Sequence, residues 1–162
     1  MYSKVKILGH PLHAMLVPFP VAFYAATVVC YICYSFNGDA FMFRVAVMAN
    51  CAGVSTAALA AIPGFIDWLY IPKEKRAKRI GLLHMICNLA ALALYGITLF
   101  SLCPKLEESA PDDGPAVIMT MMGFILTLVA GFLGWSLVQK HHVGVHLTPE
   151  QQKIDPKDGV SS

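Results

Sequence analysis

Six histidines are the side chains of this sequence best suited to bind a metal ion or a haem iron. Two of them, His10 and His13, stand three residues apart in the segment GHPLH, and a third, His84, lies near the start of a later apolar run. The other three follow the last apolar run: His141, His142 and His146. Imidazole nitrogens coordinate iron, zinc and copper, and imidazole titrates near neutral pH, so these residues favour haem ligation, metal ligation or proton transfer.

Haem comes first among these possibilities, because two imidazoles on facing helices can bind one iron axially. His13 and His84 form the best pair, since each is expected one turn inside a helix at the same end of a helical bundle. Asn88 follows His84 by four residues and faces the same way, so we expect it to hydrogen-bond a ligand or a neighbouring helix. His10 and His142 are the further cofactor-binding candidates at that end. The predicted cofactor is one b-type haem, and no residue is assigned to catalysis.

The same end of the bundle offers a second kind of site, a single transition-metal ion without haem. His13 and His84, joined by His10 and Asp67, would supply nitrogen and oxygen ligands of the kind that zinc, iron and copper accept. The adjacent histidines after the last run are weaker candidates, because two neighbouring residues cannot both face inward. A third interpretation needs no cofactor, with the histidines serving as ordinary polar residues at the membrane edge.

The elements that must carry these residues are membrane helices. The chain has 162 residues, of which 57% are hydrophobic and 14% charged, with a mean hydropathy of +0.61. Soluble domains carry about 25% charged residues, and a soluble chain of this size could not bury so much apolar surface. The formal net charge of +2 is too small to suggest nucleic-acid binding, and the sequence holds no glycine motif for phosphate. The composition therefore predicts an all-α integral membrane protein.

Four apolar runs reach the length of about 20 residues that a membrane-spanning helix needs. They cover residues 12–36, 41–70, 80–103 and 115–138. We expect residues 1–146 to form a four-helix transmembrane bundle, followed by a polar cytoplasmic tail over residues 147–162. Pro11 suits the first position of a helix, whereas Pro18 and Pro20 each remove a backbone hydrogen bond and predict a bend or break. The first run should therefore begin with a short N-terminal interfacial segment that folds over the end of the bundle.

Basic residues are distributed unevenly between the two ends of the predicted bundle. Ten of the twelve lysines and arginines lie at the end that holds both termini and the loop over residues 72–79, leaving Arg44 and Lys105 at the other end. Cytoplasmic loops of membrane proteins carry the excess of lysine and arginine. The sequence thus predicts a multi-pass protein of the inner (cytoplasmic) membrane with both termini cytoplasmic, and it places all six histidines at the cytoplasmic end.

Small residues recur every three or four positions in the second and fourth runs. The second run has Asn50, Gly53, Ala57, Ala60 and Gly64, and the fourth has Gly123, Thr127, Gly131 and Gly134. Such stripes let helices pack closely in lipid, or make room for the edge of a planar cofactor. We expect Gly131 and Gly134 to lie against another helix. No internal repeat of the sequence is convincing.

The segment GHPLHAMLVPFP at residues 9–20 resembles the opening motif of a bacterial membrane family, domain of unknown function 2231. The segment PGFIDW at residues 63–68, a basic stretch, and then His84 with Asn88 resemble the remainder of the family's pattern. The family often has His-Pro twice, whereas Ala14 follows the second histidine here, which should loosen the first helix. The resemblance covers most of the chain and implies a small four-span protein without a settled activity. Some relatives are joined to redox domains such as Rieske modules, which by association favours electron transfer.

These observations predict a membrane subunit with a histidine-built site at its cytoplasmic end, transferring electrons through a b-type haem within a larger respiratory or photosynthetic complex. The protein would be a non-catalytic subunit whose partners are membrane lipids and other transmembrane subunits, with no nucleic acid. Two alternatives stay open. One is an accessory subunit without a cofactor, and the other is a metal-binding membrane protein without haem or a small transporter.

Overall fold

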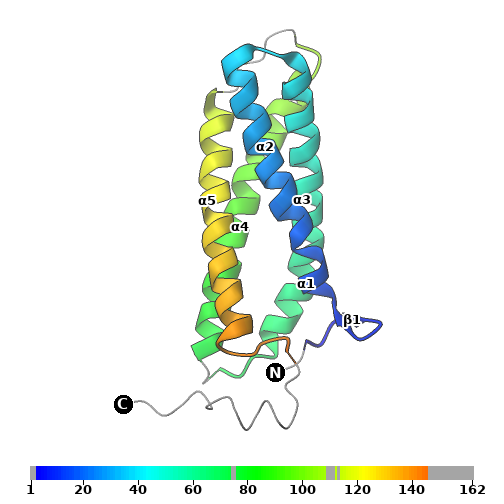
Figure 1. Ribbon diagram of the computed structural model, residues 1–162, viewed down its shortest axis with the longest axis vertical. Coiled ribbons are helices and arrows are strands. Elements are labelled where there is room, and N and C mark those ends of the chain that lie inside the picture. The colour runs from blue at the N-terminus through cyan, green and yellow to red at the C-terminus, as the bar shows by residue number, and fades with distance from the viewer. Residues whose placement is uncertain (1–2, 74–75, 109–111, 113, 146–162) are drawn as a thin grey trace.

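The computed structural model describes residues 3–73, 76–108, 112 and 114–145. Its four long helices are α2 (Pro18–Asn37), α3 (Ala40–Leu69), α4 (Arg76–Leu102) and α5 (Gly114–Gln139). They run side by side along one long axis (Figure 1). Each is long and apolar enough to cross a membrane, with α2 counted together with the short helix α1 (Leu12–Leu16) before it. The predicted all-α membrane bundle is confirmed.

Observed helix ends agree with the predicted spans to within one residue, with one exception. α4 begins at Arg76, four residues before the predicted start at residue 80. Charged side chains ended the predicted span there, yet lysine and arginine are good helix formers and carry the helix past its apolar part. At its other end α4 continues into a single 3-10 turn, Cys103–Lys105.

The tight connection between α2 and α3 follows from the residues at the turn. Gly38 ends α2 with φ 66°, a left-handed conformation that glycine adopts without a steric penalty, and its N–H donates to the carbonyl of Tyr34 at 2.8 Å. Asp39 caps α3, because its carboxylate accepts a hydrogen bond from the N–H of Phe41 at 2.9 Å. The two caps make α2 and α3 an antiparallel helical hairpin, and α4 and α5 pack together as a second one.

The chain reaches the bundle through a small antiparallel β-hairpin, β1 (Lys6–Ile7) and β2 (His10–Pro11). β2 leads directly into α1, and the break expected from the prolines lies at Val17, between α1 and α2. α1 nevertheless continues the line of α2, and the β-hairpin is the part that leaves the bundle sideways (Figure 1). The interfacial segment therefore exists, but it points sideways instead of folding over the end of the bundle.

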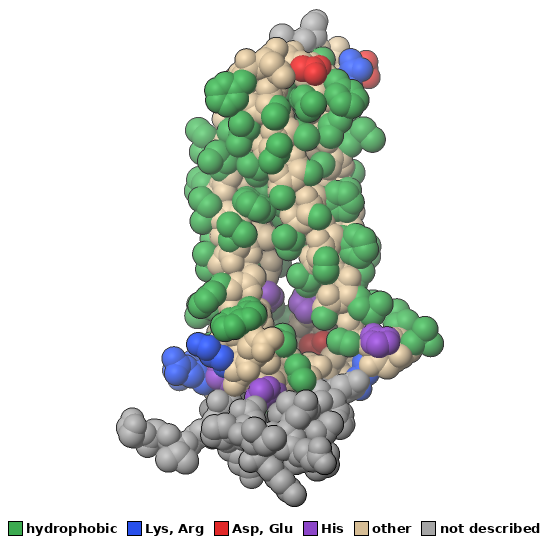
Figure 2. Space-filling view, in the orientation of Figure 1, with side chains coloured by type: hydrophobic (Ala, Val, Ile, Leu, Met, Phe, Trp, Pro, Cys, Tyr) green, Lys and Arg blue, Asp and Glu red, His purple; other side chains and the backbone are tan. Residues whose placement is uncertain are grey.

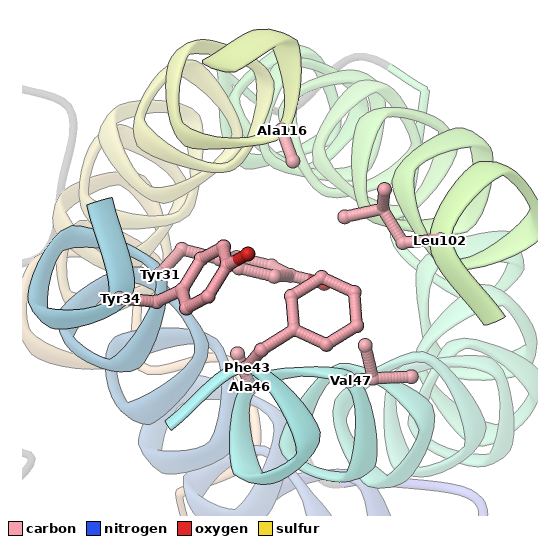
Figure 3. Packing of buried hydrophobic residues seen from close by; sticks show 7 residues of the cluster. All are labelled: Tyr31, Tyr34, Phe43, Ala46, Val47, Leu102 and Ala116. Atoms are coloured by element: carbon pink, nitrogen blue, oxygen red, sulfur yellow. The ribbon is translucent and has the colours of Figure 1, made fainter. Parts of the chain in front are cut away.

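Buried hydrophobic side chains form three clusters along the bundle. The clusters are Tyr31, Tyr34, Phe43, Ala46, Val47, Leu102 and Ala116; Tyr24, Val28 and Tyr95; and Ile71, Ala77 and Leu137. The first closes the end opposite the histidines with aromatic rings that point into the bundle (Figure 3). The third cluster lies at the end of the bundle where α3 meets α4, which we call the histidine end. Between the second and third clusters, the second helix of each hairpin carries small residues where the histidine rings pack: Ala60, Gly64, Ala130 and Gly134.

The two helical hairpins repeat one arrangement of side chains. Residues of α1 and α2 match residues of α4 71 positions later: His13 with His84, Tyr24 with Tyr95, and Thr27 with Thr98. Residues of α3 match residues of α5 70 positions later: Gly53 with Gly123, Ala60 with Ala130, and Gly64 with Gly134. In both halves these residues make equivalent contacts at the same end and depth, so the halves are related by an approximate two-fold axis along the bundle. The expectation that the chain has no internal repeat is wrong.

The matched tyrosines meet in the middle of the bundle. The rings of Tyr24 and Tyr95 stack with centroids 3.7 Å apart and 4° between their planes. Each ring fills the space above a glycine, since a Cβ at Gly53 would lie 2.7 Å from Cδ1 of Tyr24 and one at Gly123 would lie 2.8 Å from Cε2 of Tyr95. The hydroxyl of Tyr95 donates to the backbone carbonyl of Tyr24 at 3.3 Å, whereas the buried hydroxyl of Tyr24 has no hydrogen-bond partner among the described residues.

Candidate functional site

The first half of the site is the ring of His13, which α1 places against α3. Its Nδ1 lies 2.8 Å from the backbone carbonyl oxygen of Ala60. The ring lies over Gly64, one helical turn further along α3, where a Cβ would be only 2.7 Å from both Cε1 and Nδ1 of the imidazole. Real Cβ atoms do not approach so closely, so the ring can take this position because residue 64 is glycine.

The second half repeats these contacts with different helices. His84 on α4 has its Nδ1 2.7 Å from the carbonyl oxygen of Ala130 on α5. A Cβ at Gly134 would lie 3.1 Å from Cε1 of the His84 ring. Each histidine is therefore fixed in orientation by one carbonyl and one glycine of the helix that follows it in its own hairpin.

The two imidazoles face each other across the bundle. Their centroids are 6.3 Å apart and their planes are nearly perpendicular, at 87°. A carbonyl oxygen only accepts hydrogen bonds, so Nδ1 of each neutral ring carries the hydrogen and Nε2 keeps a free electron pair. That is the tautomer in which Nε2 binds a metal, and a carbonyl partner on the other ring nitrogen is the usual second contact of a metal-binding histidine.

Asn88 distinguishes the two halves. Its side-chain N–H₂ group donates to Nε2 of His84 at 3.1 Å and to the backbone carbonyl of His84 at 2.9 Å. The matching position in the first half, four residues after His13, is Val17, which cannot donate from its side chain. The prediction that Asn88 faces the same way as His84 is confirmed, and its partner is the histidine itself.

The separation of the rings suits a shared metal ion. Two imidazoles bound to opposite sides of one ion through Nε2 have centroids about 6 Å apart, because each metal–nitrogen bond is about 2 Å and each ring centre lies about 1 Å behind its nitrogen. Histidine side chains also border a hollow in the surface near this end of the bundle (Figure 2).

The other predicted ligands do not join this pair. His10 is exposed on β2. Asp67 binds the N-terminal segment: its carboxylate accepts hydrogen bonds from the Ser3 hydroxyl and the Lys4 N–H, both at 2.7 Å. Within the described ranges, no three or more His, Cys, Asp or Glu side chains come together as a metal-binding group. The four-ligand site of His10, His13, His84 and Asp67 is therefore not assembled in this structure.

The histidines after α5 lie at the edge of the described chain. His141 and His142 belong to the turn that follows the helix, and His142 adopts a left-handed backbone with φ 50°. His146 and the tail expected over residues 147–162 fall outside the described residues.

The small-residue stripes have a function that the sequence interpretation did not include. Gly64 and Gly134 make room for the histidine rings, and Gly53 and Gly123 make room for the tyrosine rings. Gly131, expected against another helix, is exposed, and a Cβ there would meet nothing within 4 Å. The pattern His-x10-Tyr-x2-Thr, which occurs in both halves, was the signal that could have revealed the paired sites.

Comparison with protein families supplies the identity of the fold. The family described as "Predicted membrane protein (DUF2231)" matches residues 9–147. The chain belongs to this family. The match begins just before His10, so it includes both hairpins of the DUF2231 bundle and both histidines of the pair. Comparisons with curated proteins and with solved structures give no match. The protein is a multi-pass membrane protein, and its activity has to be inferred from the site.

Proposed function

We propose that this DUF2231 protein holds one b-type haem between His13 and His84 and serves as an electron-transfer subunit of a larger membrane complex. The observation that carries the proposal is the facing pair of imidazoles, 6.3 Å apart, each with Nδ1 bonded to a backbone carbonyl. In each ring Nε2 is the nitrogen not bonded to a carbonyl, and imidazole nitrogens of this kind hold haem iron; on His84 this atom accepts a hydrogen bond from Asn88. The glycines under the rings support the same interpretation, because they keep both ligands in one orientation.

Bound haem iron would supply a one-electron redox centre. Nε2 of His13 and Nε2 of His84 would hold it. The carbonyls of Ala60 and Ala130 accept hydrogen bonds from Nδ1, which orients the rings and increases the basicity of Nε2. Asn88 would have to release Nε2 of His84 on ligation, since one electron pair cannot serve both partners. Electrons would be exchanged with neighbouring transmembrane subunits.

The test is spectroscopic and uses the full chain, expressed with haem precursors and purified in mild detergent. We expect one haem per chain by pyridine haemochrome assay, a low-spin spectrum and a sharp α-band after reduction. His13→Ala and His84→Ala should each abolish the low-spin spectrum. His10→Ala is the matched control, because His10 is exposed on the β-hairpin and should leave the spectrum unchanged. Helicity and monodispersity of every variant exclude simple unfolding as the cause.

Other outcomes separate the alternatives. A colourless protein with one equivalent of zinc, iron or copper, lost in both alanine variants, would overturn the haem proposal in favour of a non-haem metal site. A protein with neither haem nor metal would leave the histidines as polar links between helices and favour an accessory subunit. Loss of colour in His10→Ala but not in His84→Ala would place a haem elsewhere.

We also propose that both termini face the cytoplasm, on the basis of the ten basic residues at the histidine end. Reporter fusions placed after Ser162 and within residues 107–113 should report opposite compartments. A cytoplasmic report from the fusion within residues 107–113 would reverse this orientation and would place the histidine pair at the outer face.

A further inference from the structure

The tip of the N-terminal β-hairpin has an unusual composition for a turn. The hairpin pairs Lys6 with Pro11 and Ile7 with His10, so Leu8 and Gly9 form a two-residue turn. Both turn residues have positive φ, 51° for Leu8 and 83° for Gly9. Turns of this kind favour asparagine or glycine at the first position, and a leucine held there is sterically disfavoured. Leu8 is also 94% exposed, so its side chain gains nothing from the protein in return.

The position of the hairpin explains how such a residue could be useful. The hairpin directly precedes the first membrane span, which begins at Leu12, and it projects sideways from the base of the bundle (Figure 1). A segment in that position lies at the height where the hydrocarbon of a bilayer meets the headgroups. Met15 and Phe19, on the chain that rises from the hairpin, are half exposed and would contact lipid at the start of this span.

The charged residues of the hairpin and its attachment to the bundle both indicate a lipid surface as its partner. Ile7, beside the tip, is 51% exposed, while Lys4 and Lys6 stand at the base of the hairpin, where anionic headgroups would lie. The base is fixed to the bundle, because the N–H groups of Lys4 and Val5 donate to the carboxylate of Asp67, and the N–H of Leu12 donates to the carbonyl of Val5. The tip is thus held away from the bundle in a defined direction.

We propose that the hairpin is a membrane-interface anchor: Ile7 and Leu8 insert among the lipids of the leaflet at the histidine end, with Lys4 and Lys6 at its anionic headgroups. Burial of the two apolar side chains in lipid offsets the free-energy cost of the strained turn. Because β2 continues into α1, the anchor also fixes the position of His13 relative to the leaflet. The inference does not depend on whether the histidine pair binds haem.

The test places a fluorescent reporter at the tip of the full chain. Leu8→Trp is reconstituted without other proteins in nanodiscs of phosphatidylcholine and phosphatidylglycerol, with or without bromine at carbons 6 and 7 of the acyl chains. Its signal is taken as the difference from the unmodified chain, which contains two tryptophans. We expect bromolipid to quench this signal at least twofold and iodide to quench it weakly. Lys73→Trp, at an exposed position between α3 and α4, is the matched control and should show the opposite pattern.

A second reporter, Ile7→Trp, keeps the proposal testable if Leu8→Trp fails to fold, and should give the same result. Iodide quenching of both reporters as strong as that of Lys73→Trp, without bromolipid quenching, would put the tip in water and overturn the proposal. Protection from both quenchers, together with cross-linking of two chains through the tip, would also overturn it by identifying a second copy as the partner.

Discussion

His13 and His84 occupy matched positions, yet the first stands on a helix of five residues and the second inside a helix of 27. His13 depends on support from outside its helix, since Ser3 and Lys4, just before the β-hairpin that leads into α1, donate hydrogen bonds to Asp67 of α3. His84 has its extra support within its own helix, from Asn88. The contacts common to both halves, a carbonyl and a glycine, therefore define the site, and the contacts that differ determine how firmly each ring is held.

The largest effect should come from the glycines beneath the rings. Gly64→Ala places a Cβ 2.7 Å from two atoms of the His13 ring, so the ring must move and its bond to Ala60 is lost. We expect a loss of about 2 kcal/mol of stability, as for other overpacked sites, together with loss of the proposed haem. In Gly134→Ala the new Cβ would lie 3.1 Å from Cε1 of His84, so the loss of stability should be about half as large. Thermal unfolding in detergent and haem content measure both.

Gly131→Ala is the control for this pair, because Gly131 faces open space on the same helix as Gly134. Its melting temperature should equal or slightly exceed that of the unmodified protein, because the Cβ meets open space and alanine is the better helix former. If Gly131→Ala and Gly134→Ala are equally destabilised, the effect belongs to helix packing in general and not to the histidine ring.

Asp67→Ala should affect the first half alone. Removing the carboxylate takes away the acceptor for the Lys4 and Val5 N–H groups, and hydrogen bonds to a charged group contribute about 1.5 kcal/mol. Amide hydrogen exchange at residues 4 and 5 should become roughly tenfold faster. Asn88→Ala, in the other half, should leave these two amides unchanged, and equal acceleration in both variants would contradict the separation of the two supports.

The stacked tyrosines offer a smaller test of the two-fold relation. Tyr95→Phe removes a buried hydrogen bond to the carbonyl of Tyr24 and should cost about 1 kcal/mol. Tyr24→Phe removes a buried hydroxyl that has no partner among the described residues, so it should be neutral or slightly stabilising. Denaturant titration of the two variants in the same micelles gives the comparison directly. Equal losses would mean that the Tyr24 hydroxyl is satisfied in the membrane.

The smallest expected effect comes from exchanging the residues four positions after each histidine. Asn88→Val gives the second half the residue of the first and removes the amide that competes for Nε2 of His84. Breaking this exposed hydrogen bond before ligation costs about 0.7 kcal/mol. Without that cost, the proposed haem should bind about threefold more tightly. The reverse exchange, Val17→Asn, should weaken binding by a similar factor. Haem titration of the apoprotein measures both, and weaker binding in Asn88→Val would mean that the amide supports the bound state.

Hydropathy and proline positions were sufficient to predict the spans and the break before Pro18, because both depend on local properties of the chain. The pairing of His13 with His84 could also be predicted, since four spans place both at the same end and depth. The carbonyls of Ala60 and Ala130 could not, because every residue has a carbonyl and only the packing of helices selects two of them.

The repeat is hard to recognise in the sequence for a physical reason. Only a few positions per helix contact another ring or backbone, and the residues between them face lipid, where any apolar side chain serves. Matched residues are 71 positions apart in the first helices of the two hairpins and 70 positions apart in the second helices. No single shift of the sequence therefore aligns the two halves. The glycines form a stripe in the sequence, but a stripe alone cannot distinguish a contact with a ring from open space, and the contact expected for Gly131 is wrong.

The strongest helix contacts lie within each hairpin, α2 with α3 and α4 with α5. Transmembrane helices associate after they have inserted into the bilayer, and the stronger contacts within each hairpin would form first. During biogenesis, each half would therefore acquire its own oriented histidine before the two halves meet. The pair of ligands then exists only in the associated protein, and a molecule bound between the rings would join the two halves as the last step of assembly.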